Sequence, residues 1–260
     1  MPVLDNQNNK NYKNGYLIYN KDFMFKGKFL SKDPYKIAEI CFNTSMTGYQ
    51  EILTDPSYKS QFINFTFPLI GIVGCNEEDF ESWKVQASGM ISNEILNLSS
   101  NWRSKENFSK WLLDQNSCAF FDIDTRALTK VIREYGPKNV MICSEDFYDK
   151  NGLEKILSLI NSSLTLEQND VIKEFTKELN LSKVDKHKKQ LSIGFLNFGA
   201  KDNIKNNLRL RNCNLYEYDM NFDADKIINL KLDGLFLSNG PGDPKKIFQN
   251  IKPELKKLLN

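Results

Sequence analysis

The chain has 260 residues, a formal net charge of +2 and a charged fraction of 26%. Such balanced charge gives no reason to expect a nucleic-acid or membrane surface. No run approaches the roughly 18 apolar residues that a bilayer span needs. We therefore expect a soluble protein with one large domain or two ordinary ones.

The N-terminus and the cysteines indicate a cytoplasmic protein. Residues 1–14 are polar and lack the apolar core of a secretory signal, so we predict a disordered leader. The cysteines are odd in number and scattered, with no CxxC pair and no metal spacing, which is typical of a reducing cytosol. They are Cys41, Cys75, Cys118, Cys143 and Cys213.

The single histidine, His187, lies among lysines in "SKVDKHKKQL", which favours a solvated linker position. A Cys–His or Ser–His pair needs its base within hydrogen-bond reach of the nucleophile. We therefore do not expect histidine-based acid–base catalysis by this chain alone.

The first elements along the chain predict a β-rich half. Aromatic residues alternate with polar ones over residues 15–30, which predicts a hairpin turning near Asn20–Asp22. Then follow a strand over 37–45, a short helical piece with a turn at Pro56, a strand over 61–67 and a strand in "VQASGMISNEI".

Two helices with local start signals come next. "SKENFSKWLLDQN" has apolar residues at helical spacing and Ser104 as a candidate N-cap. "DTRALTKVIREYGP" has Asp124 or Thr125 as its cap, and Gly136 ends it. The strand "SCAFFDI" lies between them, and "LEKILSLINSSL" predicts a further amphipathic helix.

The pattern changes after a polar, basic segment that we predict to be a linker, residues 177–190. We predict one domain over 15–176 and another over 191–260. In the second, the strands "LSIGFLNF", "NLYEYD" and "DGLFLS" alternate with helices, the last being "IKPELKKLLN" with Pro253 in its first turn. This alternation is typical of a doubly wound parallel sheet, with the apolar "DGLFLS" as a buried strand.

Two stretches have more than one interpretation. "NGPGDP" follows a predicted strand, where parallel sheets bind ligands, and its glycines would let backbone N–H groups approach a negative charge. It is equally typical of a tight turn. "FNTSMTGYQ" is rich in hydroxyl and amide groups, which either satisfy a turn or donate to a polar ligand.

Together these stretches carry a family resemblance. "FNTSMTGYQEILTDPSY", "DIDTRALTKVIREYG", "NFGAKDNI" and "LDGLFLSNGPGDP" resemble, in the same order, the small glutamine-hydrolysing subunit of carbamoyl-phosphate synthase. The resemblance implies an α/β chain: a β/β/α swivelling-type N-terminal domain, then the start of a doubly wound class I glutamine amidotransferase domain.

The resemblance also implies a function. The family hydrolyses L-glutamine and passes ammonia to a large subunit, which makes carbamoyl phosphate from bicarbonate and ATP for arginine and pyrimidine biosynthesis. No cofactor or metal is implied on this chain, since ATP is used by the large-subunit partner. The residues that match the glutamine-binding positions are Ser45, Gly240 and Gly242. The first of these glycines would offer its N–H to the oxyanion.

The chain departs from the family pattern at three places. Asn197 stands where the family usually has Asp, and Ile72 where it usually has Asn. The family's "G-x-C-x-G-H-Q" nucleophile and its later histidine do not occur within the 260 residues. We therefore expect a truncated family member that binds glutamine weakly and does not hydrolyse it.

Two alternatives remain open at this point. The chain could be a non-catalytic module that docks on the large synthetase subunit. It could also be another class I amidotransferase, such as one serving anthranilate or GMP synthesis, but those enzymes lack the "FNTSMTGYQ" domain.

Overall fold

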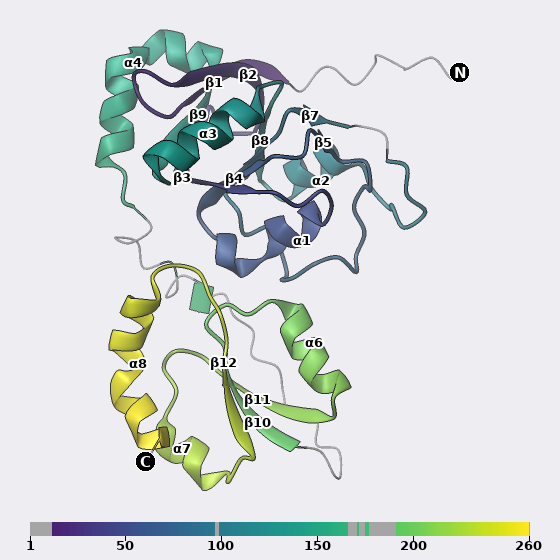
Figure 1. Cartoon of the computed structure of the whole chain (residues 1–260), viewed down its shortest axis with the longest axis vertical. Helices are drawn as coiled ribbons and strands as arrows, with labels where there is room; N and C mark the ends of the chain where they lie inside the picture. Colours follow the sequence, from purple (N-terminus) through teal and green to yellow (C-terminus); the bar gives the residue numbers. More distant parts are fainter. Residues whose placement is uncertain (1–11, 97–98, 166–170, 172–174, 177–190, 260) are drawn as a thin grey trace.

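The computed structural model describes residues 12–96, 99–165, 171, 175–176 and 191–259. Within them the chain has a mixed α/β fold in two parts (Figure 1). The N-terminal part contains a closed seven-stranded barrel, and the C-terminal part a three-stranded parallel sheet. The predicted linker lies wholly outside the described residues. The predicted leader lies mostly outside them, but its last two residues, Lys13 and Asn14, are paired in the first strand and not disordered. The domain boundaries stay predictions.

The barrel joins strands from most of the N-terminal part in the order β1-β2-β8-β6-β4-β3-β9. The β1–β2 hairpin and β9 pair antiparallel, whereas β3–β4, β4–β6 and β6–β8 pair parallel. The bounds are β1 Lys13–Ile18, β2 Met24–Leu30, β3 Tyr35–Asn43, β4 Gln61–Phe65, β6 Gly89–Ile91, β8 Cys118–Phe121 and β9 Asn139–Ser144.

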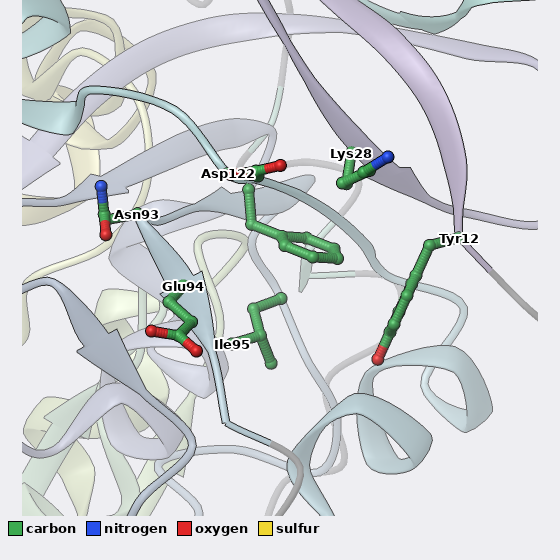
Figure 2. A pocket seen from close by; sticks show the side chains of 7 residues that line it. Tyr12, Lys28, Asn93, Glu94, Ile95 and Asp122 are labelled. Atoms are coloured by element: carbon green, nitrogen blue, oxygen red, sulfur yellow. The ribbon is translucent and has the colours of Figure 1, made fainter. Parts of the chain in front are cut away.

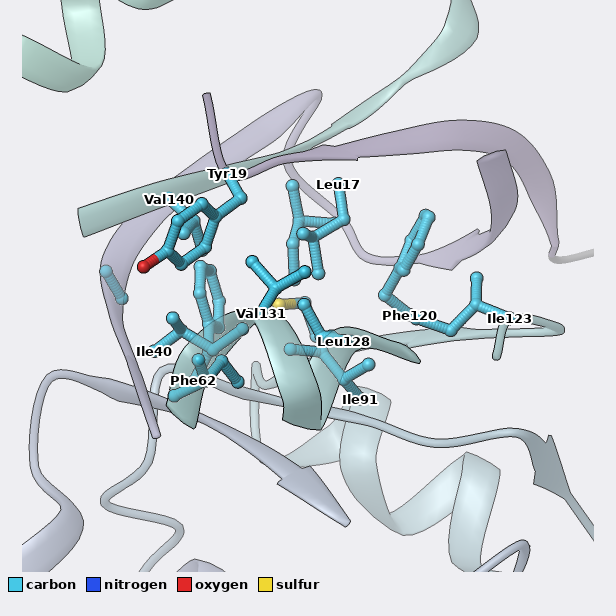
Figure 3. Close-up of a cluster of buried hydrophobic side chains, with 14 of the residues drawn as sticks. Leu17, Tyr19, Ile40, Phe62, Ile91, Phe120, Ile123, Leu128, Val131 and Val140 are labelled. Atoms are coloured by element: carbon cyan, nitrogen blue, oxygen red, sulfur yellow. The ribbon is translucent and has the colours of Figure 1, made fainter. Parts of the chain in front are cut away.

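Alternation of side chains along the strands explains how the barrel fills its interior. One set of alternate residues, taken from all seven strands, forms a single buried cluster with helix α3 (Thr125–Tyr135). Figure 3 shows Leu17, Phe62 and Phe120 of the strands around Leu128 of this helix. The barrel is therefore a packed core, closed with the help of α3.

The neighbouring residues on the same strands face outward and are covered by other helices. Helices α1 (Tyr49–Thr54) and α2 (Phe108–Asp114) share a buried cluster with β4, β6 and β8. Helix α4 (Glu145–Ser162) packs on β1 and β9. The short strands β5 (Leu69–Ile70) and β7 (Glu94–Ile95) pair beside the barrel.

The C-terminal sheet has the strand order β11-β10-β12, and all pairs are parallel. Helix α6 packs on one face against Phe195 and Leu215, while α7 and α8 pack on the other against Leu196. The bounds are β10 Leu191–Leu196, α6 Asp202–Leu210, β11 Cys213–Tyr218, α7 Ala224–Asn229, β12 Gly234–Leu237 and α8 Pro244–Leu259.

Several expectations are confirmed in detail. The predicted N-terminal hairpin is the β1–β2 pair, with Asn20 accepting two backbone N–H groups in the turn. Helix α3 is capped by Asp124, whose carboxylate accepts the N–H of Ala127 at 2.8 Å. For α3 the capping residue was therefore predictable from the local sequence. The structure also shows a cap of the same kind at α7, where the side chain of Asp223 accepts the N–H groups of Asp225 and Lys226.

Other expectations were wrong. Helix α2 is capped by Asn107 and not by Ser104, because Cys75 pairs with Glu106 and keeps the residues before Asn107 extended. Helix α8 begins at Pro244, just after Asp243 caps it, so Pro253 lies inside the helix and not in its first turn. Strand β12 has the apolar sequence of a buried strand but lies at the sheet edge, where Leu237 is 45% exposed, as expected for the last strand of a sheet that ends there.

In the described part of the chain, no helix is long and apolar enough to cross a membrane.

Replacing Asp124 by Ala should destabilise the barrel by about 1 kcal/mol, because the helix loses its N-cap acceptor. Asp124→Asn keeps an acceptor at that position, so its free energy of unfolding should stay within a few tenths of a kcal/mol of that of the parent. Urea unfolding followed by tryptophan fluorescence measures the difference. Equal loss in both variants would contradict the capping role.

Candidate functional site

The predicted binding residue Ser45 lies in an exposed loop that follows β3. The backbone N–H of Ser45 donates to the Asn43 side chain at 2.8 Å, which closes a tight turn at the strand end. The amide nitrogen of Asn43 in turn donates to the hydroxyl of Tyr58 at 3.1 Å. The loop with the Ser45 hydroxyl is thus tied to the short 3-10 helix η2 (Pro56–Tyr58).

The glycine loop, Asn239–Gly242, follows β12 and reaches the same short helix. The side-chain amide of Asn239 donates to the hydroxyl of Ser57 at 2.8 Å, across 182 residues of chain. Gly242 has φ of 83°, a left-handed conformation that glycine adopts without strain. The loops of both predicted binding stretches therefore converge on η2, from opposite parts of the chain.

Glycine is required by close backbone approach between the loops after β10 and β12. A Cβ on Gly240 would overlap the carbonyl oxygen of Phe198, and one on Gly199 would lie 2.5 Å from Pro241 Cδ. The hydroxyl of Ser238 accepts the N–H of Phe198 at 2.9 Å. The carboxyl ends of these two strands thus meet where open α/β sheets bind their ligands.

Asn197 organises the loop after β10. Its side-chain oxygen accepts the N–H groups of Gly199 and Ala200, both at 3.0 Å. Its nitrogen donates to the buried carboxylate of Glu217 at 3.3 Å, which also lies 3.2 Å from the ammonium of Lys205. An aspartate at this position would bring a second negative charge to Glu217, so the amide suits this network.

Asp55 brings a buried negative charge to the same region. Its side chain is 4% exposed and lies 3.0 Å from the ammonium of Lys201. Burial lowers the pKa of Lys201, but the hydrogen bond and charge of Asp55 outweigh it, so the pKa is raised overall. Lys201 therefore stays charged and holds the loop after β10 against the end of α1.

The described cysteines are poor nucleophiles. Burial raises the pKa of the Cys41 and Cys143 thiols to about 12 and that of Cys118 to about 11, and it also raises that of Cys75. These four thiols are thus protonated at neutral pH, whereas nucleophilic attack needs the thiolate. Cys118 is 1% exposed and belongs to the buried cluster inside the barrel. His187 lies outside the described residues.

Two cavities in the described part of the chain are lined by residues other than Ser45, Gly240 and Gly242. A cavity of about 520 Å³ lies beside the barrel and is lined by Tyr12, Lys28, Asn93, Glu94, Ile95, Phe121 and Asp122 (Figure 2). A hollow of about 370 Å³ lies between α6 and Phe236. Among the described residues, no cluster of three or more His, Cys, Asp or Glu side chains could hold a metal ion.

Residues that the sequence interpretation missed lie around the predicted ones. Asp55, Ser57 and Tyr58 were read only as part of a turn at Pro56 and of the family motif, and Asn239 only as part of the glycine loop. Their partners lie in distant parts of the chain, so local pattern gave no signal for them. The one available signal is "TDPSY", in which Asp before Pro-Ser marks a capped turn.

Comparisons with known proteins identify the family. Residues 17–142 match the family model "Carbamoyl-phosphate synthase small chain, CPSase domain", and residues 195–260 match "Glutamine amidotransferase class-I". The chain is therefore similar to one family in its N-terminal part and to class I glutamine amidotransferases in its C-terminal part. The chain belongs to the carbamoyl-phosphate synthase small-chain family.

Individual relatives agree with that assignment, and each carries the name carbamoyl phosphate synthase small chain. The one from Clostridium acetobutylicum is 38% identical over 244 residues, covering 94% of this chain and 67% of the relative. The one from Photorhabdus laumondii is 39% identical, covering 89% of this chain and 63% of the relative. The chain thus spans about two thirds of the length of these relatives.

Replacing Gly240 by Ala should weaken the C-terminal sheet by about 1–3 kcal/mol, because the new Cβ would force Phe198 and the end of the preceding strand β10 to move. Gly234→Ala is the matched control in β12, since its Cβ would meet only the tip of Ile193, at 3.4 Å. Hydrogen exchange of the β10 and β12 amides measures both. A Gly240 variant that exchanges like the control would contradict this close packing.

Proposed function

We propose that this chain is the glutamine-recognising part of a carbamoyl-phosphate synthase small subunit. The single observation that supports it most strongly is the convergence of the loops after β3 and β12 on Pro56–Tyr58 in a member of this family. L-Glutamine would bind between these loops, at Ser45, Gly240 and Gly242.

Ser45 and Gly240 have distinct chemical roles in the proposal. The hydroxyl of Ser45 both donates and accepts, which suits the charged amino-acid end of glutamine. The N–H of Gly240 would stabilise the oxyanion that forms when the amide carbon is attacked, and losing such a donor typically costs roughly a hundred- to thousand-fold in turnover. No cofactor on this chain enters this chemistry.

In the whole small subunit this site would hydrolyse glutamine and release ammonia to a large-subunit partner. That partner would use ATP and bicarbonate to make carbamoyl phosphate for arginine and pyrimidine biosynthesis in the cytoplasm. The 260 residues contain no "G-x-C-x-G-H-Q" segment, and the described thiols other than Cys213 are held protonated. The polypeptide of residues 1–260 would therefore bind glutamine without hydrolysing it.

A second function is docking on the large synthetase subunit, with no catalytic role. It is favoured by the closed barrel, whose interior is filled by residues of its seven strands and of helix α3, all from the N-terminal part of the chain. In this proposal the barrel is the family's β/β/α swivelling-type domain, and the parallel sheet is the start of its doubly wound amidotransferase domain.

Calorimetric titration of the 260-residue chain with L-glutamine should detect weak binding, and Ser45→Ala should weaken it about tenfold through loss of a hydrogen bond to a charged group. Ser158→Ala, on the exposed side of α4, should bind like the parent. An ammonia assay on the same samples should stay at background. A turnover typical of intact amidotransferases, or binding unaffected by Ser45→Ala, would contradict the proposal.

Docking is tested separately by copurification with a tagged large synthetase subunit. Both the 260-residue chain and its Ser45→Ala variant should be retained, because the substitution changes only the loop after β3 and leaves the rest of the barrel surface intact. A carbamoyl-phosphate synthase large subunit that retains neither protein would argue against the docking function.

A further inference from the structure

Helix α6 is capped by a residue of the N-terminal part of the chain. Its own N-cap residue, Lys201, makes no side-chain cap. Instead, the carboxylate of Glu81 accepts two hydrogen bonds from Asn203, one from its backbone N–H at 3.1 Å and one from its side-chain amide at 3.0 Å. The backbone carbonyl of Glu81 accepts the N–H of Asp202 at 2.9 Å. One residue thus satisfies two unpaired N–H groups of a helix 122 residues away.

Glu81 is itself held rigidly by the N-terminal part. It is 6% exposed, and its backbone N–H donates to the hydroxyl of Thr54 at 2.9 Å. Thr54 is fully buried at the end of α1, where its hydroxyl also donates to the carbonyl of Gln50. A buried carboxylate is stable only with such partners, and the positive end of a helix dipole suits it.

A second contact joins the same two places. Asp55, the residue after Thr54, pairs with Lys201, the residue before α6. Asp55, which ends α1, and Glu81, which is bonded to Thr54, therefore hold the segment Lys201–Asn203 through one ion pair and three hydrogen bonds.

These three residues continue directly from the loop that packs on the glycine loop. Gly199 and Ala200 bond to Asn197, and Phe198 and Gly199 lie against Gly240 and Pro241 so closely that no Cβ fits. A displacement of Lys201–Asn203 would therefore be passed to Gly240 through backbone contacts and not through flexible side chains.

We propose that Glu81 is a positioning residue that sets the place of the Gly240–Gly242 loop from the N-terminal part of the chain. It touches no reacting group and acts through Asn203 and the loop after β10. Only the identity of the ligand at that loop rests on the proposed function, so positioning is measurable without glutamine.

The first test is hydrogen exchange, followed by mass spectrometry, on the full 260-residue chain. Glu81→Gln removes the charge and one acceptor at unchanged size, and peptides covering 197–205 and 238–243 should exchange about tenfold faster. Peptides covering β11 and α8 should stay within about twofold of the parent, because their own packing is unchanged. Glu77→Gln, at an exposed acid nearby, is the matched control and should match the parent throughout.

A second variant guards against a folding defect near α1. Asn203→Ala lies on an exposed residue of α6, leaves the barrel untouched and removes only the donor to Glu81 Oε1. Hydrogen exchange of the peptides covering 197–205 and 238–243 should again be faster than in the parent, but by less than in Glu81→Gln. Uniform acceleration over 191–259 in both variants, or no acceleration at 238–243 in either, would overturn the proposal.

Glutamine titration separates this inference from the proposed function. If the parent chain binds glutamine, Glu81→Gln should weaken binding about tenfold and Glu77→Gln should not; equal affinity of all three proteins would overturn positioning. If the parent binds no glutamine, the proposed function fails, and the exchange measurement alone decides whether Glu81 positions the loop.

Discussion

The buried side chain of Asp55 joins the two parts of the chain. One carboxylate oxygen accepts the N–H of Ser57 at 2.9 Å, and the other lies 3.0 Å from the ammonium of Lys201. A buried carboxylate without such partners would lose its hydration at high cost. Asp55 ends α1 and begins η2, the short helix that both site loops contact. Its carboxylate therefore fixes η2 and, through Lys201, the segment that leads into α6. The Asp55 side chain is therefore the point at which the contacts of both site loops meet.

The sequence predicted the elements whose signals are local. The β1–β2 hairpin, the Asp124 cap of α3 and the strand–helix alternation after Leu191 all follow from spacing, capping and turn residues within a few positions. Strand β9 was missed because "NVMICS" lacks the alternation of apolar and polar residues that indicates a strand. Barrel closure was out of reach for a different reason: it depends on pairing β1 with β9, such as Gly15 with Ser144.

The candidate site divides in the same way. Glycines after a strand and polar residues after another strand are readable as binding loops, and family motifs name Ser45, Gly240 and Gly242 among them. The sequence could not predict the long-range hydrogen bonds that hold these loops in place. The bonds of Glu81 to Asn203 and of Ser57 to Asn239 join residues more than a hundred positions apart, and neither pair has a pattern that marks it.

The link between Asn197 and Glu217 has a consequence for substitution at position 197. The amide of Asn197 serves both neighbours at once, accepting from the loop N–H groups and donating to Glu217. A carboxylate at position 197 would keep the first role and turn the second into repulsion between two buried charges. The residues at positions 197 and 217 are therefore coupled, because a carboxylate at 197 fits this network only with a change at 217 that removes the second negative charge.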